Sequence, residues 1–263
     1  MVKLERVSSP WGFMSSNVLK IIACVSMFVD HLGLVIFPTD FGFRMIGRLA
    51  FPLFAFFIAE GCHYTKRKAR RFWLLFGSGI FYLIFFRFMS GTFYASIFLT
   101  FSASVIIIYS LDYMKKCIFS ERGICERVFS VALCAGLIFG FYMLEKYVEF
   151  DYGFVGMMIP VLVSLFDFRD LSVPAFLRAL DTYYVRIIML TLGIIALFLT
   201  YSGVYVYIFS VKVSIYWAYF AVPVLLLFYN GKVGKIKMKY FFYIFYPVHL
   251  VVIYGLGMLI FMF

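Results

Sequence analysis

Long apolar runs separated by short polar segments fill the sequence from residue 18 onward. A helix needs about 20 predominantly apolar residues to cross a hydrocarbon core about 30 Å thick, and most of these runs approach that length. The pattern therefore predicts an all-α fold, a polytopic transmembrane bundle of about nine helices. The expected helices are 18–37, 43–63, 72–89, 94–113, 128–144, 152–166, 185–201, 214–229 and 240–261.

The basic residues between these runs predict the orientation of the bundle. The densest basic stretch, 66–71, follows the second run, and cytoplasmic loops carry an excess of Lys and Arg. Alternation from this loop places the basic stretches 115–116 and 232–239 on the same side. It also makes segment 1–17 a cytoplasmic N-terminal segment and places the C-terminus outside. We find no internal repeat, so residues 18–263 are expected to form one membrane domain.

Composition excludes a soluble globular protein. Apolar residues make up 65% of the chain and aromatic residues 22%, and the mean hydropathy is +0.99, whereas ordinary globular chains are about half apolar. The net charge of +11 does not require a nucleic-acid partner, because cytoplasmic loops account for it. The five cysteines include no C-x-x-C, so neither a zinc site nor a disulfide framework is indicated. No removable signal peptide is evident, so the first helix is expected to remain as an anchor.

Two histidines are predicted to reach a similar depth in the membrane. His31 follows Lys20 by eleven positions, a helical rise of roughly 16 Å. His249 follows Lys239 by ten positions, a rise of roughly 15 Å. Pro247 removes a backbone donor and is expected to kink the last helix toward a cavity. We therefore expect His31 and His249 to meet. An ordinary interhelical hydrogen bond is the alternative for either ring.

Three charged residues accompany this pair. Asp30 precedes His31, but adjacent helical positions point about 100° apart, so Asp30 need not bond that ring. Its partner is either His31 or a basic residue on another helix, such as Arg48. Arg44 and Arg48 lie four positions apart near the outer edge of the second helix. Arg48 is a full turn deeper and is expected to hold Asp30 or to stabilise developing negative charge. Snorkelling to the interface is the alternative for both arginines.

Glu60 and His63 share a face near the inner end of the second helix. We count both as candidate substrate- or cofactor-binding residues. For Glu60, an ion pair with the adjoining basic loop is the alternative. Aromatic and Met side chains on all helices are interpreted as packing and lipid-facing residues.

Two kinds of chemistry fit an intramembrane histidine near charged groups. It can act as a general base on a hydroxyl or amine, or it can take part in proton-coupled transport. A basic cytoplasmic rim suits the phosphates of coenzyme A. The sequence has no P-loop, no G-x-S-x-G and no H-E-x-x-H, so ATP-driven and zinc-peptidase functions have no support.

Four blocks of sequence resemble the TraX family, integral membrane proteins named for the enzyme that N-acetylates conjugative pilin. In chain order the blocks are LKIIACVSMFVDHLGLVIFP, FRMIGRLAFPLFAFFIAEG, DYGFVGMMIP and FFYIFYPVHL. The family is similar, more distantly, to membrane acyltransferases that modify glycans and lipids. Those proteins carry a basic residue, ten intervening positions and a histidine in the first helix, a spacing that Lys20 and His31 fit.

The resemblance implies an acetyl-CoA-dependent acetyltransferase in the bacterial cytoplasmic membrane. His31 would be the catalytic histidine, with Lys20 at the acyl-CoA side and Asp30 or His249 in support. Acetyl-CoA would be the co-substrate and no metal would be needed. The implied partners are the lipid bilayer, acetyl-CoA and an acceptor that is a peptide such as the pilin N-terminus, a glycan or a lipid. The matching family positions are Asp30, Arg44, Gly47, Arg48, Pro52, Glu60, Asp151, Tyr152, Pro247 and His249.

The chain departs from the family pattern in two places, at Gly77–Tyr82 and at Ser96–Thr100. These departures leave the acceptor open rather than the chemistry. Two other functions stay open as well. A proton-coupled transporter would also bury His, Asp and Arg, although many transporters show internal repeats. A non-enzymatic membrane assembly factor is the third possibility.

Overall fold

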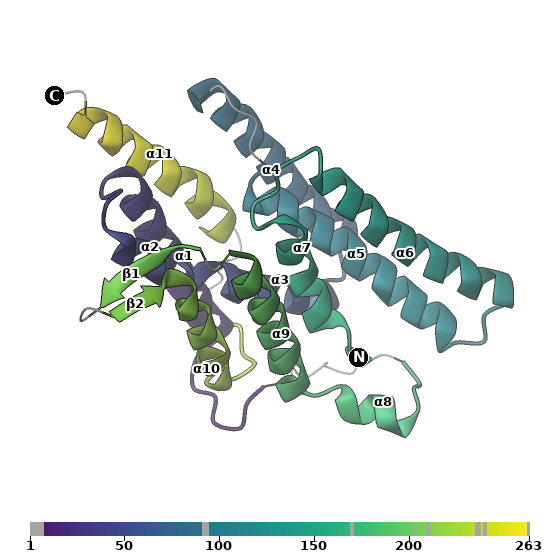
Figure 1. Cartoon of the computed structure of the whole chain (residues 1–263). Coiled ribbons are helices and arrows are strands. Elements are labelled where there is room, and N and C mark those ends of the chain that lie inside the picture. Colours follow the sequence, from purple (N-terminus) through teal and green to yellow (C-terminus); the bar gives the residue numbers. More distant parts are fainter. Residues whose placement is uncertain are drawn as a thin grey trace. The chain divides into compact units, whose positions relative to one another are not determined.

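The computed structural model describes residues 8–90, 95–168, 171–201, 203–208, 211–234, 238 and 241–261 (Figure 1). The described chain is mainly helical and contains a single two-stranded antiparallel hairpin. It divides into two compact units. Unit 1 comprises residues 1–54 and 194–263, and unit 2 comprises residues 55–193. Helices α3 (Ala50–Tyr64) and α9 (Tyr183–Tyr201) each continue from one unit into the other.

Unit 1 is built on α1 (Ser16–Val35), which packs against α2 (Phe41–Gly47) and α11 (Phe241–Phe261). The side chain of Ser15 caps the first turn of α1 by accepting from the backbone N–H of Val18. The rest of the unit consists of β1 (Tyr205–Ile208), β2 (Val211–Ser214), the 3₁₀ helix η1 (Ile215–Phe220) and α10 (Ala221–Leu227). Helix α2 also packs against η1, so the start of the chain meets its last fifth.

Unit 2 centres on α5 (Ile97–Ile118), which packs against α4 (Lys68–Ser90), α6 (Ile124–Glu145) and α7 (Gly153–Ser164). Most of α5 is buried, whereas α6 exposes most of its apolar side chains. A helix that is apolar all round and exposed within the fold is typical of a lipid-facing segment. The short helix α8 (Ala175–Leu180) lies in the connection between α7 and α9.

Six helical segments are long and apolar enough to cross a membrane. They are 16–35, 41–64, 68–88, 97–118, 124–145 and 183–201. The polytopic helical fold that the sequence predicts is therefore confirmed. The other three predicted spans correspond to shorter apolar helices at 153–164, 215–227 and 244–260. The count of nine spans, their orientation and the single domain over 18–263 stay predictions.

Two predicted helices differ from the structure for local reasons. The helix expected over 43–63 is interrupted at Arg48 and Leu49, between α2 and α3. The helix expected over 214–229 begins as 3₁₀ helix η1 and becomes α-helical only from Ala221. The hairpin β1–β2 was not predicted. Its strands pair in the register Tyr205 with Ser214 and Ile208 with Val211.

Six basic residues lie outside the described residues, and three of them belong to the stretch 232–239 that was used to predict the orientation. The six are Lys3, Arg6, Arg169, Lys235, Lys237 and Lys239.

Candidate active site

His31 of α1 and His249 of α11 meet in unit 1, as the depth estimate from the sequence predicts. Nε2 of His249 lies 3.0 Å from Nδ1 of His31. The ring centroids are 5.0 Å apart. His249 is only 4% exposed, whereas His31 is half-buried. The two helices lie side by side (Figure 1), so residues from the two ends of the chain form one pair.

The neighbours of the pair fix where its hydrogen atoms lie. Nδ1 of His249 is 2.8 Å from the carbonyl oxygen of Phe245. A carbonyl oxygen only accepts, so Nδ1 of His249 carries a hydrogen and donates it. In a neutral imidazole the other nitrogen accepts, so Nε2 of His249 accepts from Nδ1–H of His31. By the same rule, Nε2 of His31 carries the lone pair. The neutral pair therefore ends in an unprotonated nitrogen that can accept a proton.

Aromatic side chains hold these rings in place. The ring of Phe245 stacks on His249, with centroids 4.8 Å apart and an interplanar angle of 13°. Tyr246 is buried and meets both imidazoles edge to face. Its ring centroid is 6.4 Å from that of His31 and 5.5 Å from that of His249. Such contacts restrict ring rotation and so preserve the hydrogen-bond direction described above.

Asp30 binds two arginines rather than a histidine. Its Oδ2 lies 3.1 Å from Nη1 of Arg44, and its Oδ1 lies 3.2 Å from Nη2 of Arg48. Arg48 also donates from Nε to the carbonyl oxygen of Arg44, at 3.2 Å. Of the two partners that the sequence leaves open for Asp30, the structure thus has the arginine. We call Asp30, Arg44 and Arg48 the charged triad.

The charged triad depends on close packing of α1 against α2. A Cβ added at Gly47 would overlap the side chain of Asp30, so only glycine leaves room for the carboxylate there. Gly33 stands against Phe43 in the same way. Small residues that let helices approach closely are typical of membrane helix interfaces.

Two aromatic rings extend this part of unit 1. The guanidinium carbon of Arg48 lies 5.5 Å from the ring centroid of Tyr216 in η1. Nζ of Lys20 lies 5.6 Å from the ring centroid of Phe242 in α11. Cation–π contacts of this kind stabilise cations that have lost part of their hydration. Lys20 and His31 therefore both contact α11, each at its own level of α1.

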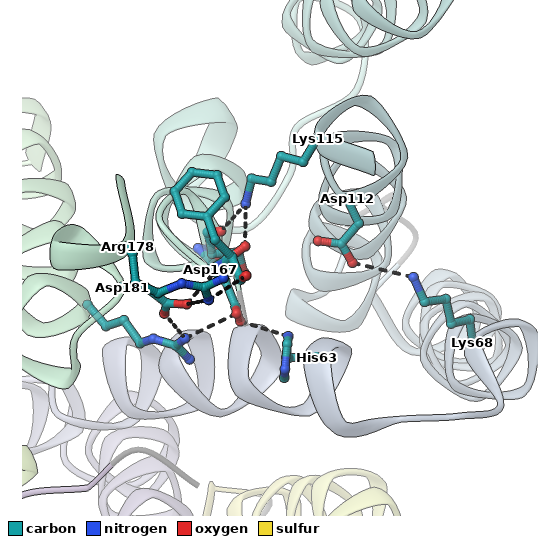
Figure 2. Close-up of polar contacts among 11 residues, drawn as sticks. His63, Lys68, Asp112, Lys115, Asp167, Arg178 and Asp181 are labelled. Carbon is teal, nitrogen blue, oxygen red and sulfur yellow. Dashed lines mark hydrogen bonds and ion pairs between the residues drawn. The ribbon is translucent and has the colours of Figure 1, made fainter. Parts of the chain in front are cut away.

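A second polar cluster lies in unit 2 and contains His63 (Figure 2). Nδ1 of His63 is 2.8 Å from Oδ2 of Asp167. The other oxygen of Asp167 is 3.2 Å from Nη2 of Arg186, which also lies 3.0 Å from Oδ1 of Asp181. Among the described residues, buried Nε2 of His63 has no hydrogen-bond partner. We call His63, Asp167, Asp181 and Arg186 the His63 network.

This network ties down the connection between α7 and α9. Oδ2 of Asp181 accepts from the backbone N–H of Phe168 at 3.0 Å. Arg178 donates to the carbonyl oxygens of Phe168 and Leu171. Lys115 of α5 donates to the carbonyl oxygens of Ser164 and Asp167, at 2.7 and 3.3 Å (Figure 2). Backbone carbonyl groups at the end of α7 and in the segment after it thus accept hydrogen bonds from side chains.

The remaining sequence-predicted residues also lie in unit 2. Glu60 is buried one turn before His63 on α3, and its charge acts on Tyr183. The backbone of Asp151 joins α5: its N–H donates to Ala95 and its carbonyl oxygen accepts from the hydroxyl of Thr100. Tyr152 caps α7 in the left-handed region, at φ 61°. These backbone contacts join the turn before α7 to the start of α5.

Sequence reasoning did not single out several members of these clusters. They are Tyr216, Phe245 and Tyr246 in unit 1 and Asp167, Asp181 and Arg186 in unit 2. Asp167 and Asp181 lie between two predicted helices, 152–166 and 185–201, in a segment to which the sequence analysis assigned no site. Arg186 lies near the start of a predicted apolar helix. A charged residue in a membrane helix suggests a functional or paired site, so the sequence did contain a signal for Arg186.

Comparison with known proteins adds three findings. A family model described as TraX protein matches residues 15–257. An uncharacterized protein of Rickettsia prowazekii (strain Madrid E) is 41% identical over 54 residues, which is 20% of this chain and 21% of that protein. The chain thus aligns with about a fifth of the length of this relative. No solved structure matches.

Proposed function

Since the chain belongs to the TraX family, we propose that it is a membrane acetyltransferase. It would move an acetyl group from acetyl-CoA to an amine or hydroxyl acceptor in the cytoplasmic membrane of a bacterium. The observation that carries the proposal is the His31–His249 pair, because it ends in an unprotonated imidazole nitrogen among charged and aromatic side chains.

The pair has the properties of a general base. Nε2 of His31 would take the proton of the acceptor N–H or O–H as that atom attacks the thioester carbonyl carbon. The positive charge that develops on His31 would be shared with His249 through their hydrogen bond. The carbonyl oxygen of Phe245 would stabilise it from the far side of His249. The carbon–sulfur bond breaks, and the proton ends on the sulfur of coenzyme A.

Lys20 is the residue we assign to the donor side. It lies eleven positions before His31 on α1 and contacts Phe242 of α11. By the orientation predicted from the basic loops, it stands near the cytoplasmic edge, where acetyl-CoA is present. A lysine there would interact with a phosphate of the donor as a point charge.

The proposal is tested by acetyl transfer from labelled acetyl-CoA in membranes that contain the full chain. Replacing a general base lowers such rates by about 10²–10⁴-fold. We expect a loss in that range for His31→Ala and for His31→Gln, which keeps a polar group but no basic nitrogen. The thermal midpoint of unfolding shows whether each variant is folded.

A matched variant probes the second ring. In His249→Asn, an amide N–H can replace Nδ1–H toward the carbonyl oxygen of Phe245, but the group that accepts from His31 is lost. We expect transfer to fall, by less than in the His31 variants. Full transfer by a folded His31→Ala protein refutes the assignment. Proton-driven solute flux without acetyl transfer would favour the transporter instead, and retention of the cellular function by His31→Ala would favour an assembly factor.

A further inference from the structure

The charged triad brings more positive than negative charge into the core of unit 1. One carboxylate, Asp30, faces the two guanidinium groups of Arg44 and Arg48. Arginine is always protonated, so the formal charge of the triad is +1. The side chain of Arg48 is only 8% exposed and that of Asp30 only 14%. This charge therefore lies largely out of contact with solvent water.

The sequence of unit 1 contains few acidic residues that could balance the positive charge of the triad. Residues 1–54 and 194–263 contain ten Lys and Arg but only three acidic residues. Besides Asp30 these are Glu5, outside the described residues, and Asp40. Asp40 is exposed, and its Oδ1 accepts from the backbone N–H of Gly42 at the start of α2. Excess positive charge is thus a property of the whole unit and is concentrated at the triad.

The two guanidinium groups of the charged triad favour an oxyanion as a ligand. Guanidinium groups present planar forks of donors that match the oxygen atoms of phosphate and carboxylate. The side chain of Arg44 is 27% exposed, so a ligand can reach the triad from that side. His31 follows Asp30 directly on α1, so the base and the triad lie at the same level of that helix. An anion held by the triad would therefore keep its neighbouring atoms close to the base.

We propose that the charged triad binds an oxyanion, a phosphate in the first place, carried by the acceptor, and that acceptors bearing such a group next to the reacting hydroxyl or amine are the preferred substrates. The proposal rests on the proposed function and narrows its acceptor class.

Binding is tested first, with inorganic phosphate as the probe. The purified full chain is heated with phosphate or with chloride at equal ionic strength. A ligand that binds the native state raises the midpoint of unfolding in a saturable way. We expect this rise in the wild type, its loss in Arg44→Gln and a weaker rise in Arg44→Lys, which keeps the charge without the fork. Arg44 is the preferred position because its partial exposure allows substitution without a buried defect.

The control variant is Lys212→Gln. It removes the same charge from the same unit, but Lys212 is exposed on β2, where its Nζ lies 4.2 Å from the ring centroid of Tyr205. This variant should keep the phosphate effect. The absence of any rise in the wild type overturns the proposal, and so does an equal rise in Arg44→Gln.

Transfer is tested second, with acceptors that differ by the anionic group. Glycerol phosphate is compared with glycerol in solution, and phosphatidylglycerol with diacylglycerol in phosphatidylcholine nanodiscs, to separate a free phosphate from a lipid headgroup. We expect a phosphate-bearing acceptor to be used at least tenfold better, through a lower KM, and this preference to vanish in Arg44→Gln. If Arg44→Gln lowers kcat equally for all acceptors, the arginines stabilise the transition state instead and the proposal fails.

The two experiments separate this proposal from the proposed function. Phosphate binding at the triad without any acetyl transfer leaves the anion site standing and removes the acetyltransferase. Acetyl transfer that ignores the phosphate and the Arg44→Gln change leaves the acetyltransferase standing and removes the anion site.

Discussion

The charged triad and the His63 network use the same residue types in opposite ways. In unit 1 the carboxylate of Asp30 is held by two arginines, and the histidines bond to each other. In unit 2 the carboxylate of Asp167 holds a histidine, and Arg186 lies between two carboxylates. The first arrangement contains one more positive than negative side chain. In the second, His63 and the charged side chains bind one another, and Asp181 also accepts from a backbone N–H.

This difference shows that residue type and membrane depth do not identify a reactive site by themselves. Both regions contain a histidine on an apolar helix close to Asp and Arg. The two regions differ in the net charge of their polar cluster and in the direction of their hydrogen bonds. We therefore interpret the His63 network as a structural clamp on the connection from α7 to α9. Three substitutions test this difference between the two regions.

The largest effect on stability is expected for Asp167→Ala. The change takes a carboxylate oxygen from His63 and another from Arg186, which keeps only Asp181. Breaking a buried ion pair by removing one partner costs about 3–5 kcal/mol. We expect a loss in that range in the free energy of unfolding, measured by SDS titration in mixed micelles. Asp167→Asn, which keeps the shape, should lose less. A loss below about 1 kcal/mol for the alanine variant would contradict the clamp.

A smaller effect is expected for Gly47→Ala in unit 1. The added methyl group would overlap Asp30 and push α1 away from α2, and overpacking of this kind costs about 1–3 kcal/mol. Because the triad is displaced, acetyl transfer should fall with stability. The matched control is Gly77→Ala on α4, where a Cβ meets open space and helix propensity favours Ala by up to about 1 kcal/mol. Equal behaviour of the two variants would show that close α1–α2 packing is not required.

The smallest effect is expected for His63→Asn. The amide N–H of Asn can replace Nδ1–H toward Asp167, and Nε2, which is lost, has no described partner. We expect a change below about 1 kcal/mol in the free energy of unfolding and acetyl transfer within about threefold of wild type, a rate change of less than 1 kcal/mol. A tenfold loss of transfer in a folded protein would instead support the substrate-binding role that the sequence suggested for His63.

Counting helical rise was enough to predict the central pair. His31 and His249 were placed at similar depth from Lys20 and Lys239, and the structure joins them at 3.0 Å. The helical angle between Asp30 and His31 likewise left an arginine as one of two partners for Asp30, and the structure has the arginine. Both inferences work because the geometry of a membrane helix is regular and the membrane leaves few polar groups to choose from.

The other contacts depend on information that one apolar run does not contain. The break at Arg48 and Leu49 directly follows Gly47, the residue that stands against Asp30 of α1. The partner of His63, Asp167, lies beyond four further helices, α4 to α7, in a connection that hydropathy reads only as polar. The short helix α7 spans 12 residues, roughly 18 Å of rise, and α5 contacts its backbone just before the first residue, at Asp151, and at the last residue, Ser164.

The pairing of His31 with His249 also has a consequence in time. The two residues are 218 positions apart in the chain. At about 5–20 residues per second, a ribosome needs roughly 10–40 s to reach the second histidine after the first. Until the last helix has been inserted, His31 has no imidazole partner and the base is incomplete. Under the proposed function, a chain whose last helix has not yet been inserted would therefore lack a complete base.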